Sequence, residues 1–229
     1  MKIIEKIAKN NEDLHNPSAT ICFFGDSITQ GCFYDGADYE AVYHNIIRKK
    51  LNILFPRATT TIINAGIGGD NATSSLERIE QDVISKNPDL CVVCFGLNDM
   101  NETDEAVLKY RESLSGIFKK LKSYGCEIIF MTPNMMATKV TDSIPPKWMH
   151  RADDKIKIMS DGIMDRFMDT AKAVAKEFDI VVCDCYKKWK RLEKMGVDTT
   201  ALLANGLNHP IREMHELFAY SLLETMFGE

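Results

Sequence analysis

Short apolar runs alternate with longer amphipathic segments along all 229 residues, and this alternation constrains the fold more than any other feature. Five of the runs are typical of buried strands; they cover residues 19–24, 59–64, 89–95, 127–132 and 179–184. Apolar residues at three- and four-residue steps predict helices between and after them; these lie at about 39–54, 72–86, 104–124, 154–178 and 211–227. Near-continuous apolar strands separated by helices indicate a parallel sheet that is covered on both faces.

The chain shows no repeat, low-complexity tract or linker, and the sequence therefore predicts a single domain over residues 1–229. Residues 1–18 precede the first strand and are expected to form an N-terminal extension. Residues 133–154 contain a Pro-Pro pair, which interrupts regular structure, and are expected to form a long loop over the edge or mouth of the sheet.

Composition excludes several classes of function. A net charge of −5 and a pI near 5.6 do not provide the basic surface that nucleic acids require. No apolar stretch approaches the ~20 residues of a membrane span, and the first residues mix charges into the apolar ones, unlike a signal peptide.

Seven scattered cysteines, an odd number, favour reduced thiols and a cytoplasmic location. Cys91 and Cys94 form a C-x-x-C within a strand, where they face opposite sides and cannot share a metal or a disulfide.

Chemically distinctive residues follow the first three strands and precede the last helix. They occur in GDSIT (25–29), NAGIGGDN (64–71), GLNDMN (96–101) and NGLNHP (205–210). Ligands of open α/β sheets bind beyond the carboxyl ends of the strands, so a serine, a glycine turn, an asparagine and a histidine are expected on one rim. Acyl transfer needs such a set: a hydroxyl nucleophile, a base near neutrality, and fixed N–H donors for the oxyanion.

These motifs resemble, in content and in order, the sequence blocks of the SGNH (GDSL-type) hydrolases. The resemblance implies Ser27 as nucleophile, His209 as base, and an oxyanion hole formed by the Gly69 backbone N–H and the Asn98 side-chain amide. It also implies a three-layer α/β/α sandwich, flavodoxin-like, with about five parallel strands, which agrees with the strand count. The expected activity is that of a carboxylic ester hydrolase without metal or organic cofactor.

Each of these residues also has a simpler interpretation. Ser27 could cap a helix, and Asn98 could cap a turn. The GIGG segment could bind a dinucleotide, but Asn71 stands where G-x-G-x-x-G requires its third glycine. His215 competes with His209, but it falls inside the last expected helix, whereas His209 precedes a proline in a loop. The four blocks together favour the catalytic interpretation.

The chain departs from the family pattern at one position. The D-x-x-H motif of the family places an aspartate three residues before the histidine, and Gly206 stands there instead. The group that orients His209 is therefore expected to be Asn205, a backbone carbonyl, or the more distant Asp198. A neutral group would fix the imidazole tautomer with less stabilisation of the imidazolium, and would make the enzyme correspondingly slow.

The sequence thus predicts a serine esterase that acts on small, acetyl-type esters through an acyl-serine intermediate. Acetylated carbohydrate is one candidate substrate, with Tyr34 and Trp148 as candidate lining residues. Alternatives are a lipase or thioesterase of the same fold, and a non-catalytic ligand-binding module on a degenerate hydrolase site. No signal for an oligomeric state is present.

Overall fold

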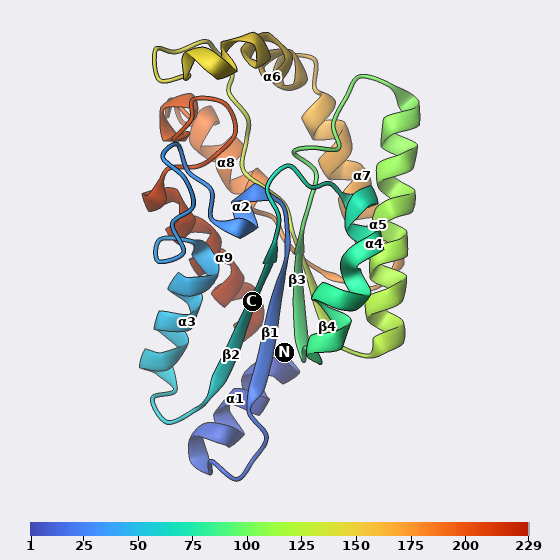
Figure 1. Ribbon diagram of the computed structural model, residues 1–229, viewed down its shortest axis with the longest axis vertical. Coiled ribbons are helices and arrows are strands. Elements are labelled where there is room, and N and C mark those ends of the chain that lie inside the picture. The colour runs from blue at the N-terminus through green and yellow to red at the C-terminus, as the bar shows by residue number, and fades with distance from the viewer. Residues whose placement is uncertain (229) are drawn as a thin grey trace.

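The computed structural model describes residues 1–228 and contains a five-stranded sheet (Figure 1). The strands are β1 (Ala19–Gly25), β2 (Thr60–Gly66), β3 (Leu90–Cys94), β4 (Glu127–Met131) and β5 (Val181–Cys183). Their order is β2-β1-β3-β4-β5, and all neighbouring pairs are parallel. The predicted parallel sheet is confirmed.

The direction of strand addition reverses next to β1. The chain adds β2 on one side of β1 and then returns to add β3 on the other, so Ile21 of β1 lies opposite both Ile62 and Leu90. Such a reversal opens a crevice at the carboxyl ends of the strands, because the flanking loops leave in opposite directions. The loops after β1, β2 and β3 therefore meet at this crevice.

Helices cover both faces of the sheet, as expected for a three-layer α/β/α sandwich (Figure 1). They are α1 (Lys2–Glu12), α2 (Ser27–Gln30), α3 (Tyr43–Leu54), α4 (Ala72–Asp82), α5 (Asp104–Tyr124), α6 (Ala152–Ser160), α7 (Ile163–Glu177), α8 (Cys185–Lys194) and α9 (His215–Phe227). Short 3₁₀ turns lie at Ile84–Lys86, Pro146–Arg151, Thr200–Leu202 and Arg212–Met214. Helices α3 and α9 pack together on one face, and α4, α5 and α7 on the other.

Three helices differ from the sequence-based expectation. The helix expected over 154–178 is two helices, because Gly162 adopts a φ of 70° between α6 and α7 and ends the first. Helix α8 was not expected, since its sequence is mostly charged and buries only Cys185, Tyr186 and Trp189. Helix α1 occupies most of the expected extension and buries Ile3 and Ile7 in the main core.

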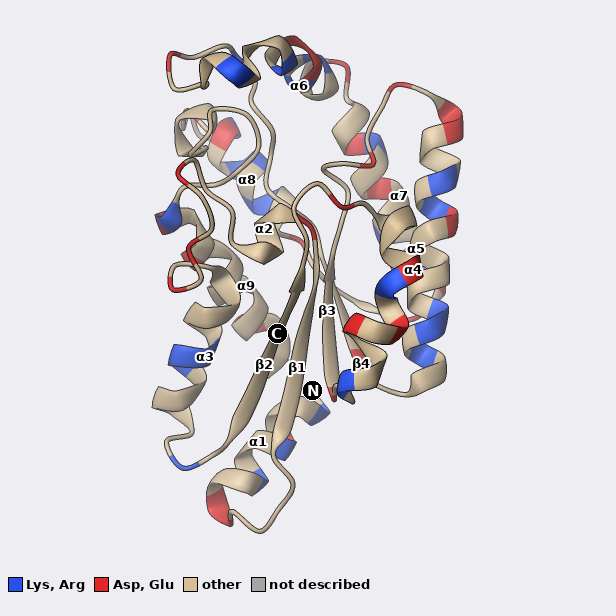
Figure 2. Ribbon diagram, viewed as in Figure 1, with Lys and Arg blue, Asp and Glu red and all other residues tan. Residues whose placement is uncertain are grey.

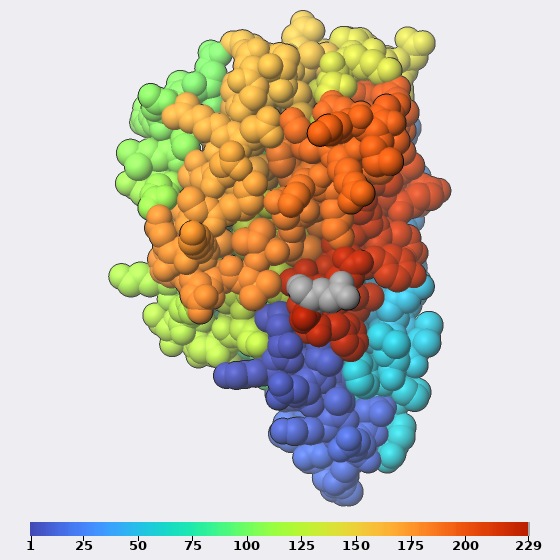
Figure 3. All heavy atoms as spheres, turned by 180° about the vertical axis from the view of Figure 1, so that it is seen from behind, coloured from blue at the N-terminus to red at the C-terminus, as the bar shows by residue number. Residues whose placement is uncertain are grey.

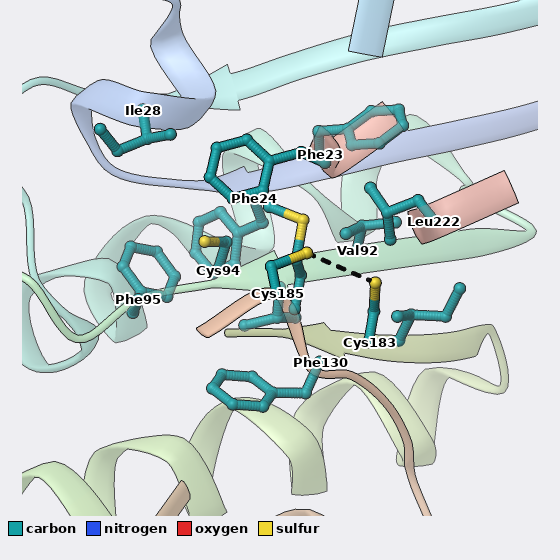
Figure 4. Packing of buried hydrophobic residues seen from close by; sticks show 14 of the residues in the cluster. Phe23, Phe24, Ile28, Val92, Cys94, Phe95, Phe130, Cys183, Cys185 and Leu222 are labelled. Atoms are coloured by element: carbon teal, nitrogen blue, oxygen red, sulfur yellow. Dashed lines mark hydrogen bonds between the residues drawn. The ribbon is translucent and has the colours of Figure 1, made fainter. Parts of the chain in front are cut away.

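The core between the sheet and its helices is closely packed (Figure 4). The rings of Phe24 and Phe95 meet edge to face with centroids 5.1 Å apart. The thiols of Cys183 and Cys185 lie 3.7 Å apart, with Cys94 close by (Figure 4). Cys91 instead lies opposite Cys22 on the neighbouring strand. The C-x-x-C sulfurs therefore belong to different parts of the core.

The two ends of the chain meet at the face opposite to the view of Figure 1, where α1 packs beside α9 (Figure 3). The Met1 amino group donates to the Met226 carbonyl at 3.2 Å, and the carboxylate of Glu127 accepts from the backbone of Ile3 at 2.7 Å. Charges lie on helices and loops, and the strands carry almost none (Figure 2). Among residues 1–228, none of the helices is both long and apolar enough to span a bilayer.

Candidate active site

Ser27 stands on a sharp turn at the carboxyl end of β1. Gly25 ends the strand, and the one-turn helix α2 begins at Ser27. A Cβ at Gly25 would lie 2.1 Å from Thr29 Oγ1 and 2.7 Å from the Cys94 carbonyl oxygen, so only glycine allows this close approach. Asp26 caps α2, because its carboxylate accepts a hydrogen bond from the Ile28 N–H at 2.9 Å. As the first helical residue, Ser27 has no intrahelical partner for its own N–H.

His209 lies directly against this serine although 182 residues separate the two in the chain. The distance from Ser27 Oγ to His209 Nε2 is 3.0 Å, which is hydrogen-bonding distance. Ser27 is 7% exposed, and the histidine ring is largely shielded from water. The structure thus brings the expected nucleophile and the expected base together.

The loop that carries His209 is held by Asn205. The Asn205 side-chain oxygen accepts hydrogen bonds from the backbone N–H groups of Leu207, Asn208 and His209, at 2.9–3.0 Å. The Ala204 N–H donates to the His209 carbonyl at 2.7 Å and closes the loop from the other side. Asn205 therefore fixes the backbone of His209 and does not reach its ring, contrary to the expectation that its amide oxygen accepts from Nδ1.

Asp198 is also remote from the histidine ring. It is exposed and pairs with Lys139 at 2.6 Å. Within residues 1–228, His209 Nδ1 is buried and meets no acceptor in hydrogen-bonding geometry. Burial lowers the pKa of His209, and the Arg151 guanidinium lowers it further. The Phe33 backbone carbonyl has the opposite effect on this pKa, because it favours the imidazolium. Among residues 1–228, none of the three expected orienting groups forms a hydrogen bond with Nδ1, and the Phe33 carbonyl affects only the pKa of the ring.

Gly69 lies in a tight turn after β2. The Asp70 N–H donates to the Ile67 carbonyl at 3.2 Å, and Gly69 has a φ of 80°, where a side chain would be strained. The turn lies against Ser27, because a Cβ on Gly68 would be 3.9 Å from Ser27 Cβ. Gly68 donates its N–H to Gln30 Oε1 at 2.7 Å, whereas the N–H of exposed Gly69 has no partner in the described chain. The Gly69 donor is therefore free for a ligand.

Asn98 approaches the same turn from the loop after β3. Its side-chain nitrogen donates to the Asp70 carbonyl oxygen at 2.9 Å, and an amide of this kind has a second N–H to offer. The neighbouring Asp99 accepts from the Ala72 N–H at 2.9 Å and so ties this loop to the start of α4. The loops after β1, β2 and β3 are thus joined beside Ser27.

Arg78 of α4 is a further part of this arrangement that the sequence did not indicate. Its guanidinium contacts Asp70 Oδ2 at 2.6 Å, the Ala65 carbonyl at 2.9 Å and the Gly25 carbonyl at 3.2 Å. Hydrogen bonds from Ser74, Ser75 and Arg78 outweigh burial and lower the pKa of Asp70. Arg78 therefore fixes the ends of β1 and β2 and the turn that follows β2. No local motif marks an arginine for this task.

Two carboxyl groups near the serine are buried among uncharged atoms. Burial is the main cause that raises the pKa of Asp26 to about 7 and that of Asp99 to about 7, and mutual repulsion with nearby carboxyls adds to it.

The competing histidine, His215, is fully buried at the first position of α9 and accepts from the Tyr43 N–H at 3.2 Å, so it is a packed residue. Tyr34 and Trp148, the expected lining residues, are 61% and 36% exposed.

A parallel α/β/α sandwich with a serine after its first strand and a histidine before its last helix is the architecture of an SGNH-type ester hydrolase. The chain belongs to the GDSL-like lipase/acylhydrolase family, whose sequence pattern matches residues 23–217. It is accordingly a carboxylic ester hydrolase.

Two named proteins are similar to this chain in sequence. The chain is 26% identical over 196 residues to the uncharacterized lipoprotein YqeF of Bacillus subtilis, covering 82% of this chain and 79% of that protein. It is 26% identical over 172 residues to an acetylxylan esterase of Geobacillus stearothermophilus, covering 67% of this chain and 76% of the relative.

Solved structures share the fold. The acetylxylan esterase Axe2 from Geobacillus stearothermophilus superimposes with a TM-score of 0.71 at 22% identity, covering 92% of this chain and 95% of that one. A lipase/acylhydrolase from Enterococcus faecalis gives a TM-score of 0.67 at 25% identity, covering 92% and 96% of the two chains.

Proposed function

We propose that this protein hydrolyses small acyl esters, acetyl esters first among them, through an acyl-enzyme formed on Ser27. The observation that carries this proposal is the 3.0 Å contact between Ser27 Oγ and His209 Nε2. A serine hydroxyl is a weak nucleophile unless a neighbouring base takes its proton, and the contact provides that base. The lowered pKa of His209 keeps the imidazole neutral near pH 7, the form in which it accepts a proton.

In the first half of the reaction, Ser27 Oγ attacks the ester carbonyl carbon while its proton passes to His209 Nε2. The tetrahedral intermediate then collapses, the bond to the alcohol breaks, and the alcohol leaves with the proton from Nε2. In the second half, water attacks the acyl-serine and gives a proton to His209. The new tetrahedral intermediate then collapses, His209 returns the proton to Ser27 Oγ, and the carboxylic acid leaves. The Phe33 carbonyl favours the imidazolium that forms in each half.

The negative charge of the tetrahedral intermediate falls on the former carbonyl oxygen. Three donors are available to it: the N–H of Ser27, the N–H of Gly69, and the second amide N–H of Asn98. Their positions are fixed before substrate arrives, because Asp26, the Gly69 turn and the Asp70 carbonyl hold them. Donors fixed in this way stabilise the transition state without reorganisation.

Acetylated carbohydrate is the substrate class we propose. The names of one relative and several fold neighbours, which are acetylxylan esterases, support it. The exposed aromatic rings of Tyr34 and Trp148 are further support, since flat rings of this kind can stack on sugars. The cytoplasmic location expected from the reduced cysteines stays a prediction.

A substrate panel tests the proposal. Purified protein and Ser27→Ala are assayed on 4-nitrophenyl acetate, butyrate, octanoate and palmitate, on acetylated xylo-oligosaccharides, and on acetyl-CoA. We expect turnover to be highest on acetyl esters, to fall with acyl length, and to vanish in Ser27→Ala. Preference for long chains would establish a lipase, and preference for acetyl-CoA a thioesterase. Binding of acetylated sugar without turnover would establish the non-catalytic alternative.

A further inference from the structure

Helix α6 lies beyond the carboxyl ends of the strands, at the top of the molecule in Figure 1, and packs onto the loop that carries His209. The contact is a small apolar cluster of Ala152, Ile144 and Leu207. Gly206 fits closely against the same segment, because a Cβ there would be 2.8 Å from Ile144 Cγ1. Helix α6 is therefore a wall of the rim that holds Ser27 and His209.

Lys155 is the unusual residue of this wall. It lies on the buried stripe of α6, between Ala152 and Ile158, and is 8% exposed. Nothing in residues 1–228 forms a hydrogen bond or an ion pair with its ammonium group, although neighbouring cations such as Lys157 are paired. The ammonium nitrogen is not among the fully buried polar atoms, so the stem of Lys155 is buried while its charged end stays accessible. An accessible ammonium without a partner in the described chain is free to meet a ligand.

A hollow of about 270 Å³ lies beside Lys155. Arg151 and Lys155 line it from α6 and the turn before it, and residues 100–102 line it from the loop that carries Asn98. This volume is at the lower end of ligand sites, and suits one part of a larger substrate. The hollow thus lies between the loop that carries Asn98 and helix α6.

The charges around this hollow favour an anion. Lys157 is neutralised by Glu102, and the Arg151 guanidinium lies over the Trp148 ring at 5.3 Å without a carboxylate partner in the described chain. Asp154 is the remaining acid of the lining, against the two cations Arg151 and Lys155. The fields of these cations reach the site itself, Lys155 acting on Asp26 and Arg151 on His209.

We propose that Lys155 and Arg151 form a subsite for an anionic group carried by the ester substrate, a carboxylate or a phosphate. The inference deepens the proposed function and rests on it. The subsite makes acetylated acidic sugars, such as uronic acids or sugar phosphates, better substrates than acetylated neutral sugars that have the same ring. Binding of the anion gives the ammonium of this largely buried lysine a partner, so the preference resides in Lys155 more than in exposed Arg151.

Three matched substrates test this subsite: mono-acetylated methyl glucoside, methyl glucuronoside and methyl glucoside 6-phosphate. The readout is the ratio of kcat/KM on each anionic ester to kcat/KM on the neutral one, which cancels any general change in the Ser27–His209 pair. We expect wild-type ratios of about 10 or more for at least one anion. Preference for glucuronoside identifies a carboxylate site, and preference for the phosphate a phosphate site.

Lys155→Met should bring both ratios to about 1 or below, and Arg151→Gln should lower them part of the way. The matched control is Lys147→Met, an exposed lysine of the preceding turn, which should keep the wild-type ratios. Because partial burial disfavours the charged ammonium and lowers the pKa of Lys155 to about 8, Lys155→Met should also raise the Tm without substrate.

Equal wild-type rates on neutral and anionic esters would overturn the subsite, as would a preference that survives in Lys155→Met. If Lys155→Met does not fold, the result with exposed Arg151→Gln decides. Absence of hydrolysis on all three substrates, with 4-nitrophenyl acetate also intact, would instead reject the proposed function.

Discussion

Asn205 Oδ1 accepts the backbone N–H of His209 at 2.9 Å, so the residue closest to the family's missing aspartate holds the main chain of the histidine and leaves its ring alone. A carboxylate at that place would both orient the imidazole and stabilise its positive charge. Here the two tasks are divided. Asn205 fixes the loop, and the Phe33 carbonyl provides a weaker electrostatic effect on the ring.

Asn205→Ala and Asp198→Ala separate these roles. Asn205→Ala removes the acceptor of three backbone N–H groups that hold the loop of His209. Because His209 then moves away from its position beside Ser27, kcat should fall by about tenfold to a hundredfold. Asp198→Ala loses only an exposed pair with Lys139, and should retain near wild-type kcat. A larger loss from Asp198→Ala, or a structure with a carboxylate about 3 Å from His209 Nδ1, would contradict this assignment.

Asn98→Ala should lower kcat by roughly 10²–10³ with little change in KM, because the amide bonds the oxyanion and not the ground-state carbonyl. Steady-state kinetics on 4-nitrophenyl acetate measure both constants. Asn52→Ala, a change of the same kind at an exposed position of α3, is the matched control and should leave kcat within about threefold of wild type. An effect of Asn98→Ala on KM alone would mean that the amide binds substrate in the ground state.

The acid limb of the pH–rate profile should have an apparent pKa below the usual ~6.5 of histidine. Neutral His209 is the active form, and its lowered pKa means that it stays neutral to lower pH. Arg151→Gln removes a nearby positive charge and should move the limb to higher pH, whereas Lys147→Gln should not. The measurement is kcat/KM on 4-nitrophenyl acetate from pH 4 to pH 9. A limb above pH 7, or one that moves down in Arg151→Gln, would contradict the account.

Asp26→Asn should stabilise the protein more at pH 8 than at pH 5. Burial raises the pKa of folded Asp26 to about 7, above an unfolded value near 4, so the folded state binds more protons between these pH values. Its contribution to the free energy of unfolding therefore falls as pH rises through this window. Asparagine keeps the cap on the Ile28 N–H and does not titrate.

Urea unfolding of wild type and Asp26→Asn at the two pH values measures the difference. Asp198→Asn, an exposed acid whose pKa is lowered, is the control and should show the same small difference at both. An Asp26→Asn effect that does not change with pH would mean that Asp26 is ionised throughout.

The sequence predicted the sheet and the positions of Ser27, Gly69, Asn98 and His209 because those depend on local patterns. Apolar runs mark strands, and the chain must turn directly after them. It did not indicate α8, since this highly charged helix buries only Cys185, Tyr186 and Trp189, too few apolar residues to stand out along the chain.

The orienting group of His209 could not be predicted for a different reason. Whether the Asn205 side chain faces the ring or the backbone depends on the loop conformation, which Gly206 at a φ of 64° permits. Arg78 and Lys155 were missed because their positions come from tertiary packing. Arg78 reaches from α4 to Asp70 and to the ends of β1 and β2, and Lys155 points inward from α6.

The central claim is that Ser27, activated by His209, is the nucleophile. Diisopropyl fluorophosphonate reacts with such serines, and peptide mass spectrometry identifies the residue that carries the adduct. We expect one adduct on Ser27, formed in step with loss of esterase activity. The adduct should be absent from Ser27→Ala, and labelling should be strongly slowed in His209→Ala. An adduct on another residue, or esterase activity that survives in Ser27→Ala, would contradict it.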